Sequence, residues 1–165
     1  MSVYVGVDNG LDGGLVALSA TPGAGIIDRI AMPTQKTGKG REVDALLVLA
    51  WLESLGTYSA LCVTLETPGK HSPGLQALCS MWDSYGALRA ICATRGIRHY
   101  RIAPQTWQKA MLPGCEKGQT KPFALSVARR LWPEEKWLAS PRCSKPHDGM
   151  IDGALIAEFS RRNNY

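Results

Sequence analysis

The N-terminal part of the chain alternates apolar residues with polar or small ones, a pattern typical of short β-strands. Three such segments, residues 3–8, 14–19 and 25–32, are separated by runs that contain Asn, Asp, Gly or Pro, the residues of tight turns. We therefore predict a three-stranded antiparallel meander. Pro33 ends the third strand, and the Gly- and Lys-containing stretch from Gln35 to Gly40 is expected to be a mobile loop.

Helical spacing begins after this stretch. Residues 42–55 have apolar side chains at intervals of three and four, so we predict a helix whose apolar face consists of Val43, Leu46, Leu47, Ala50 and Trp51. The short apolar run 60–66 stops at a carboxylate, which indicates a buried strand of the parallel type. The remaining predicted elements are a long helix from Leu75 to Cys92 closed by Gly96, a strand over 97–102, and helices over 104–112, 120–131 and 147–162.

This order of elements predicts a single α/β domain over residues 1–165. A meander followed by βαβ-type crossovers gives a mixed five-stranded sheet, with three antiparallel strands plus two parallel strands, flanked by helices. The composition agrees, because a chain of 165 residues with 45% hydrophobic residues can bury a core without disulfides or a structural metal. The five cysteines are odd in number and include no CxxC pair, which is typical of thiols in a reducing compartment.

The sequence contains no candidate membrane segment. No apolar run approaches the roughly 20 residues that a spanning helix needs. The N-terminus also lacks the basic flank and the small-residue cleavage site of a signal peptide. We therefore expect a cytoplasmic protein with no membrane partner.

The net charge of +5 is unevenly distributed. Residues 95–145 carry eleven Lys and Arg against three Asp and Glu, with Tyr100, Trp107, Trp132 and Trp137 interleaved. Such a block predicts a polyanionic partner such as nucleic acid. A solvated basic face without a ligand is the alternative that charge alone leaves open.

Four carboxylates follow or begin predicted elements that the fold would bring together. Asp8 ends the first strand and Glu66 ends the fourth, and these strands can lie side by side and parallel. Asp148 and Asp152 lie one turn apart on one face of the last helix. Each acid also has a structural explanation alone, as a turn, loop or helix-capping residue. We nevertheless expect the four acids to converge. Asp152 lies among apolar neighbours, where an ionised carboxylate without a partner is costly, so a shared site for the four acids explains its position better.

Converging carboxylates repel one another unless a cation lies between them. Oxygen ligands without thiolates or a His-rich spacing favour Mg²⁺ or Mn²⁺ over zinc. Two such ions per site would activate water and stabilise the leaving oxygen in phosphodiester cleavage. The residues therefore predict a metal-dependent nuclease.

The chain resembles the RuvC-like Holliday junction resolvases of the ribonuclease H superfold, especially the compact versions found in phages. The resemblance extends over nearly all 165 residues and is carried by three blocks: Val5 to Gly10, Val63 to Glu66, and His147 to Ala157. It implies a homodimer that cleaves four-way DNA junctions with paired, symmetric nicks, in the cytoplasm at the nucleoid or in the host cytoplasm if the protein is phage-encoded. It matches Asp8, Glu66, Asp148 and Asp152 to the family's metal-binding acids, with His147 as an extra candidate.

The resemblance also implies residues that contact DNA. Lys109 and Lys121 fall where basic residues are expected near the scissile phosphate, and Lys70 and His71 follow the glutamate where the bacterial enzyme inserts an aromatic wedge. Gly86, between Tyr85 and Leu88 in the long helix, could permit close packing of the same helix from a second subunit. Packing against the sheet is the alternative for these residues.

The sequence bears on three alternative functions. A different ribonuclease H-like nuclease, acting on RNA or other DNA structures, usually carries Asp-x-Glu in its first strand, which Asp8-Asn9-Gly10 lacks. An actin-like ATPase needs two lobes, for which 165 residues are too few. A module that binds branched DNA without cutting it stays an alternative.

Overall fold

The computed structural model describes residues 2–21, 23–38, 40–69 and 74–165. Its main sheet has the strand order β3-β2-β1-β6-β7, in which β1 pairs antiparallel with β2 and parallel with β6. This confirms the mixed five-stranded sheet. The strands are β1 (Val3–Asp8), β2 (Gly14–Ser19), β3 (Ile26–Ala31), β4 (Thr34–Thr37), β5 (Gly40–Val43), β6 (Leu61–Glu66) and β7 (Arg98–Ile102).

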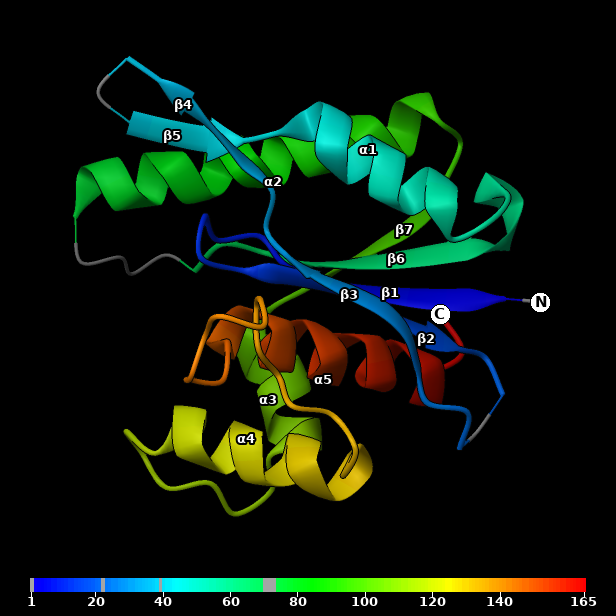
Figure 1. The fold of residues 1–165 in the computed structure, drawn as a ribbon, viewed down its shortest axis with the longest axis vertical. Coiled ribbons are helices and arrows are strands. Elements are labelled where there is room, and N and C mark those ends of the chain that lie inside the picture. Colours follow the sequence, from blue (N-terminus) through cyan, green and yellow to red (C-terminus); the bar gives the residue numbers. More distant parts are fainter. Residues whose placement is uncertain (1, 22, 39, 70–73) are drawn as a thin grey trace.

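Helices cover both faces of the sheet (Figure 1). One layer contains α1 and α2 together with the β4–β5 hairpin, and the other contains α3, α4 and α5. The helices are α1 (Ala45–Ser54), the short 3₁₀ helix η1 (Tyr58–Ala60), α2 (Leu75–Thr94), α3 (Pro104–Met111), α4 (Thr120–Leu131) and α5 (Asp148–Arg162). In the described residues, no helix is both long and apolar enough to cross a bilayer.

Each layer has its own hydrophobic core. Val5 and Val7 of β1 pack toward α1 and α2, in a core that includes Leu52 and Leu88. On the other face, Val16 of β2 packs with the buried residues of α3, α4 and α5. Each fully buried aliphatic side chain contributes about 1.5–3 kcal/mol, so α5, buried along most of its length, anchors this layer.

A glycine contact fixes the depth of α5 against β1. A methyl group at Gly6 would overlap the carbonyl oxygen of Gly153 and the backbone nitrogen of Ala157. Only glycine at position 6 therefore allows the helix backbone to lie directly on the strand. This close packing determines where the first turn of α5 meets the end of β1.

The structure corrects the predicted loop near residue 40 and the predicted start and buried face of the helix after it. Residues 34–37 and 40–43 pair as an antiparallel hairpin, with Thr34 opposite Val43, where a mobile loop was expected. The following helix begins only at Ala45, because Asp44 caps it by accepting a hydrogen bond from the N–H of Leu47 at 3.0 Å. Its buried face also differs in part: Trp51 is buried as predicted, but Leu46 and Leu47 are exposed and Val48 and Leu52 are buried instead.

In the long helix α2, Tyr85 and Leu88 are buried in the core, as the packing alternative predicted. Trp82 and Gly86 are exposed. The two orientations separate a core-facing side of the helix from a solvent-facing side.

Candidate functional site

The ends of β1 and β6 bring the first two predicted acids together. The strands run parallel with Val7 opposite Leu65, so Asp8 and Glu66 emerge at the same edge of the sheet. The side-chain amide of Asn9 donates a hydrogen bond to the backbone carbonyl of Glu66 and joins the two strand ends. The N–H of Gly10 donates to Asp8 Oδ1 at 3.1 Å and orients that carboxylate.

The start of α5 supplies the other two acids. His147 is the N-cap residue, and its Nδ1 accepts a hydrogen bond from the N–H of Met150 at 3.3 Å. Gly149 forms a bridge with Gly13 in the turn after β1, so this helix end lies against the β1–β2 connection. Asp148 in the first turn is thereby placed close to the end of β1.

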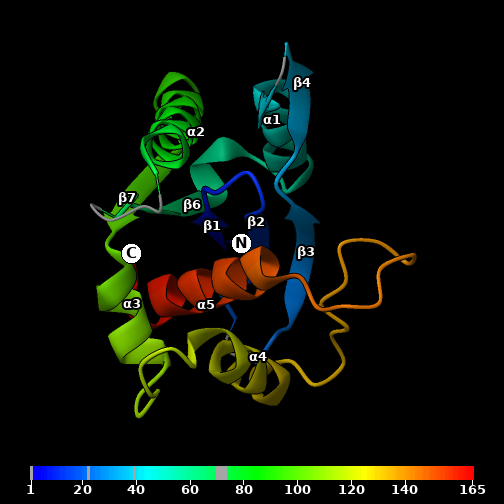
Figure 2. The same cartoon turned by 90° about the vertical axis from the view of Figure 1, so that its left-hand side faces the viewer.

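Asp8, Asp148 and Asp152 line one cavity of about 610 Å³, at the edge of the sheet that Figure 2 faces. His147, Lys121 and Arg41 also line it. Glu66 lies beside this cavity and interacts electrostatically with Asp8 and Asp152. The structure therefore brings all four predicted acids into one neighbourhood.

Burial and mutual repulsion make these acids hard to ionise together. Desolvation raises the pKa of Asp152 to about 8, with further contributions from Asp8, Glu66 and Asp148. Desolvation and the Asp8 carboxylate raise the pKa of Glu66 to about 7. Burial also raises the pKa of Asp8, against the opposing hydrogen bond from Gly10. A cation bound among these carboxylates would favour their ionised forms.

Trp107 of α3 forms a hydrogen bond with the Glu66 side chain. Its indole Nε1 donates to Glu66 Oε1 at 2.9 Å, and the Trp107 side chain is completely buried. This hydrogen bond lowers the pKa of Glu66 and so opposes the burial effect. The sequence indicated Trp107 only as an aromatic residue within the basic block, because no local pattern predicts which tryptophan reaches the strand end.

Lys121 of α4 forms an ion pair with one of the acids of α5. Its Nζ lies 2.8 Å from Asp148 Oδ2, and this hydrogen bond raises the pKa of Lys121. Among the described residues, no three Asp, Glu, His or Cys side chains lie within reach of a single metal ion. The carboxylates are therefore gathered but not arranged as a finished coordination shell, and Asp148 is held by a lysine.

The other residues predicted to contact DNA are not among the described residues that line the cavity of the acids. Lys109, at the end of α3, lines a separate cavity of about 280 Å³ that contains none of the four acids. Lys70 and His71 lie outside the described residues. Arg41, which the sequence analysis missed, reaches the cavity of the acids from the unexpected hairpin and pairs with Asp12. No periodic signal marks it, since its position depends on the β4–β5 pairing.

The sheet order and the position of α5 define a fold of the ribonuclease H type. RuvC of T. thermophilus in complex with a Holliday junction substrate is similar over 99% of this chain and 96% of that chain, with a TM-score of 0.63 and 18% identity. A second Thermus thermophilus RuvC structure is similar over 98% of this chain and 96% of that chain, with a TM-score of 0.57 and 18% identity. The chain therefore has the RuvC fold, as its sequence motifs indicated. A scan against protein-family models and a search of curated proteins found no match.

Proposed function

We propose that this protein is a metal-dependent endonuclease that cleaves phosphodiester bonds in branched DNA, in particular in four-way junctions. The observation that carries the proposal is the convergence of four carboxylates from three separate elements at one sheet edge, with raised pKa values for Asp8, Glu66 and Asp152. Clusters of this kind at a cavity are typical of catalytic sites. The RuvC fold and the basic block of residues 95–145 support branched DNA as the substrate.

The donor set fits Mg²⁺ or Mn²⁺. Carboxylate oxygens are the ligands that these hard cations prefer, and a bound cation would stabilise the ionised form of each acid. Asp8, Glu66, Asp148 and Asp152 would hold two such ions, with Mn²⁺ able to replace Mg²⁺. When bound, the ions would supply charge stabilisation and an activated water for hydrolysis of the phosphodiester.

The chain's own residues prepare the site for this chemistry. Trp107 and Asn9 fix the Glu66 side chain and backbone, and Gly10 orients Asp8. Lys121 neutralises Asp148 in the free protein, and in the complex its exposed ammonium would be available to a DNA phosphate. The basic block supplies the remaining backbone contacts, so binding is expected to weaken steeply with salt.

The direct test compares labelled four-way junctions, linear duplex and RNA–DNA hybrid, each incubated with the protein and Mg²⁺. We expect selective nicking of the junction, and loss of nicking with retained binding in the Asp152→Asn variant. Equal cleavage of linear duplex would refute junction selectivity, and cleavage of the hybrid alone would favour an RNA-directed nuclease. Binding without cleavage of any substrate would favour the non-cleaving binding module.

We further propose that the protein acts as a homodimer through the layer of α1 and α2. Leu46, Leu47, Leu75 and Trp82 on these helices are exposed, and Leu46 retains 77% and Trp82 48% of their accessible surface. Large apolar side chains left exposed on one layer of a fold favour an interface there. Analytical ultracentrifugation should give a dimer for the wild type and a monomer for Trp82→Glu, whereas a monomeric wild type would refute the proposal.

A further inference from the structure

A second hollow continues the cavity of the acids toward the hairpin. It has a volume of about 560 Å³ and lies between the β1–β2 turn, the β4–β5 hairpin and the first turns of α2. Both cavities are lined by Leu11, Arg41, Ala77 and Ser80, so they form one continuous groove past the arginine. In Figure 2 the β1–β2 turn lies between the hairpin on one side and α2 on the other.

The lining of the second cavity suits a nucleic acid backbone. None of the described residues that line it is acidic. Several of them are small and leave room for a ligand: Gly40, Gly74, Ala77 and Ser80. Arg41 is the cationic residue among them. The guanidinium group offers paired donors that match the geometry of phosphate oxygens.

Arg41 is available for such a contact. Its partner in the free protein is Asp12, whose side chain is 88% exposed, while that of Arg41 is 45% exposed. Ion pairs between side chains as exposed as these contribute little to stability. A phosphate can therefore replace the Asp12 carboxylate at small cost.

We propose that this groove takes the DNA strand that continues from the cleaved phosphate, with Arg41 bound to a phosphate of that strand. The inference rests on the proposed function and names a partner surface outside the basic block of residues 95–145. It places DNA contacts on both layers of the fold, α4 on one side of the acids and the hairpin on the other. Asp12 acts as a competitor that occupies Arg41 when DNA is absent.

The test is the affinity for a four-way junction in EDTA, where the substrate stays intact, measured over a series of salt concentrations. Arg41→Ala should weaken binding about tenfold and reduce the slope of log K against log [salt] by about one. Asp12→Asn should tighten binding several-fold, because it frees Arg41 and removes a negative charge from the groove. In the presence of Arg41→Ala, the Asp12→Asn substitution should tighten binding less than it does in the wild type, because no Arg41 is left to be freed.

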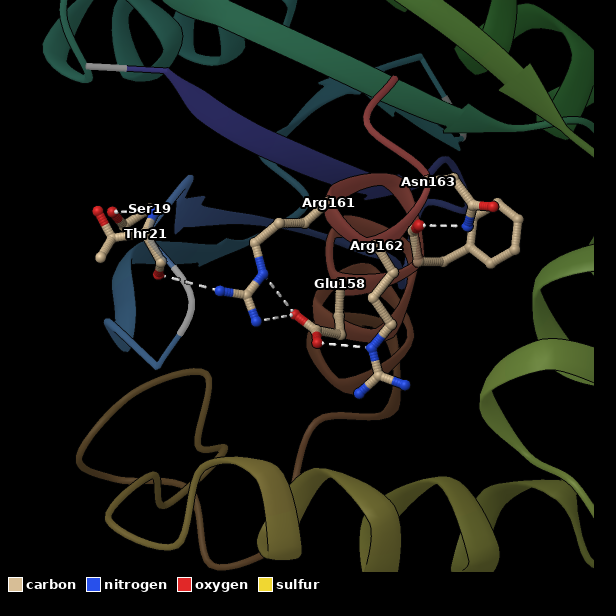
Figure 3. A network of polar contacts seen from close by, with 7 residues as sticks. Ser19, Thr21, Glu158, Arg161, Arg162 and Asn163 are labelled. Atoms are coloured by element: carbon tan, nitrogen blue, oxygen red, sulfur yellow. Dashed lines mark hydrogen bonds and ion pairs between the residues drawn. The ribbon is translucent and has the colours of Figure 1, made fainter.

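Arg162→Ala is the matched control. Arg162 is also a partly exposed arginine in an ion pair, but it binds Glu158 at the opposite end of α5, where Arg161 also contacts Glu158 (Figure 3). Its removal should leave junction affinity unchanged. Junctions that carry one neutral methylphosphonate near the cleavage position would locate the contact. At the phosphate that Arg41 binds, the methylphosphonate should weaken binding by the wild type but not binding by Arg41→Ala.

Equal affinity and equal salt slope for Arg41→Ala and the wild type would overturn the inference while leaving the proposed function intact. An effect no larger than that of Arg162→Ala would overturn it as well. A wild-type protein that binds no branched DNA would instead overturn the proposed function, and this inference with it.

Discussion

Replacing Asp152 by Asn should stabilise the metal-free protein at alkaline pH. Asp152 has its pKa raised from 3.8 to about 8 by burial and by the neighbouring acids. A carboxyl group with a raised pKa binds its proton more tightly in the folded state, so its ionisation destabilises the fold as pH rises from about 4 to about 8. An asparagine of the same shape carries no charge and avoids this cost.

The magnitude follows from the size of the pKa change. Each pKa unit corresponds to about 1.4 kcal/mol, so the full change corresponds to about 6 kcal/mol at pH 8 and above. Asp8 and Glu66 contribute to the same repulsion, and the carboxylates can rotate apart, which reduces the expected gain to about 2–4 kcal/mol. The gain should be small at pH 5 and grow steadily toward pH 9.

Urea unfolding in EDTA at pH 5, 7 and 9 measures this difference in the free energy of unfolding. Asp83→Asn, which changes an exposed aspartate of α2, is the control and should not alter the pH dependence. Added Mg²⁺ should stabilise the wild type at pH 9 and the Asp152→Asn variant much less. A variant that is no more stable than the wild type at pH 9, or equally stabilised at pH 5, would refute the reasoning.

Three further predictions concern the surroundings of the acids. Trp107→Phe removes the indole donor to Glu66, whose pKa of about 7 should rise, so the onset of Mg²⁺-dependent cleavage should move up by about one pH unit in a pH–rate profile. Trp137→Phe is the control, since the equally buried Trp137 has no hydrogen-bond partner for its Nε1 among the described residues; a shift of the same size in both variants would contradict the assignment. Gly6→Ala should destabilise the protein by about 3 kcal/mol or more in urea unfolding, because its methyl group overlaps the backbone of α5, and wild-type stability would show that the helix does not lie on β1. Lys121→Ala should tighten Mn²⁺ binding several-fold in a calorimetric titration without DNA, because the ammonium no longer competes for Asp148; unchanged or weaker binding would argue against that competition.

The central sheet was predictable because its strands carry their burial in the local pattern. The alternation in residues 3–8 predicts one strand, and the apolar run that ends at Glu66 predicts another. Together with the other predicted strands they fit one arrangement, a mixed sheet. Since parallel neighbours end at the same edge, the approach of Asp8 to Glu66 followed from topology alone. Helix spacing likewise placed Asp148 and Asp152 on one face.

Features that depend on tertiary contacts were not predictable. The hairpin of residues 34–43 contains few apolar residues, and its strands are defined by pairing with each other. Helix α1 is apolar around most of its circumference, so spacing could not select Val48 and Leu52 over Leu46 and Leu47. Neither the donor of Trp107 nor the approach of Arg41 to the acids leaves a local signal in the sequence.

The central claim is that Asp8, Glu66, Asp148 and Asp152 together form a divalent-cation site. Anomalous diffraction from a crystal soaked in Mn²⁺ tests it most directly. The account predicts manganese peaks ligated by oxygens of Asp8 and Asp152, with Asp148 released from Lys121, and loss of these peaks in Asp152→Asn. A well-ordered map with no manganese between these carboxylates would contradict it.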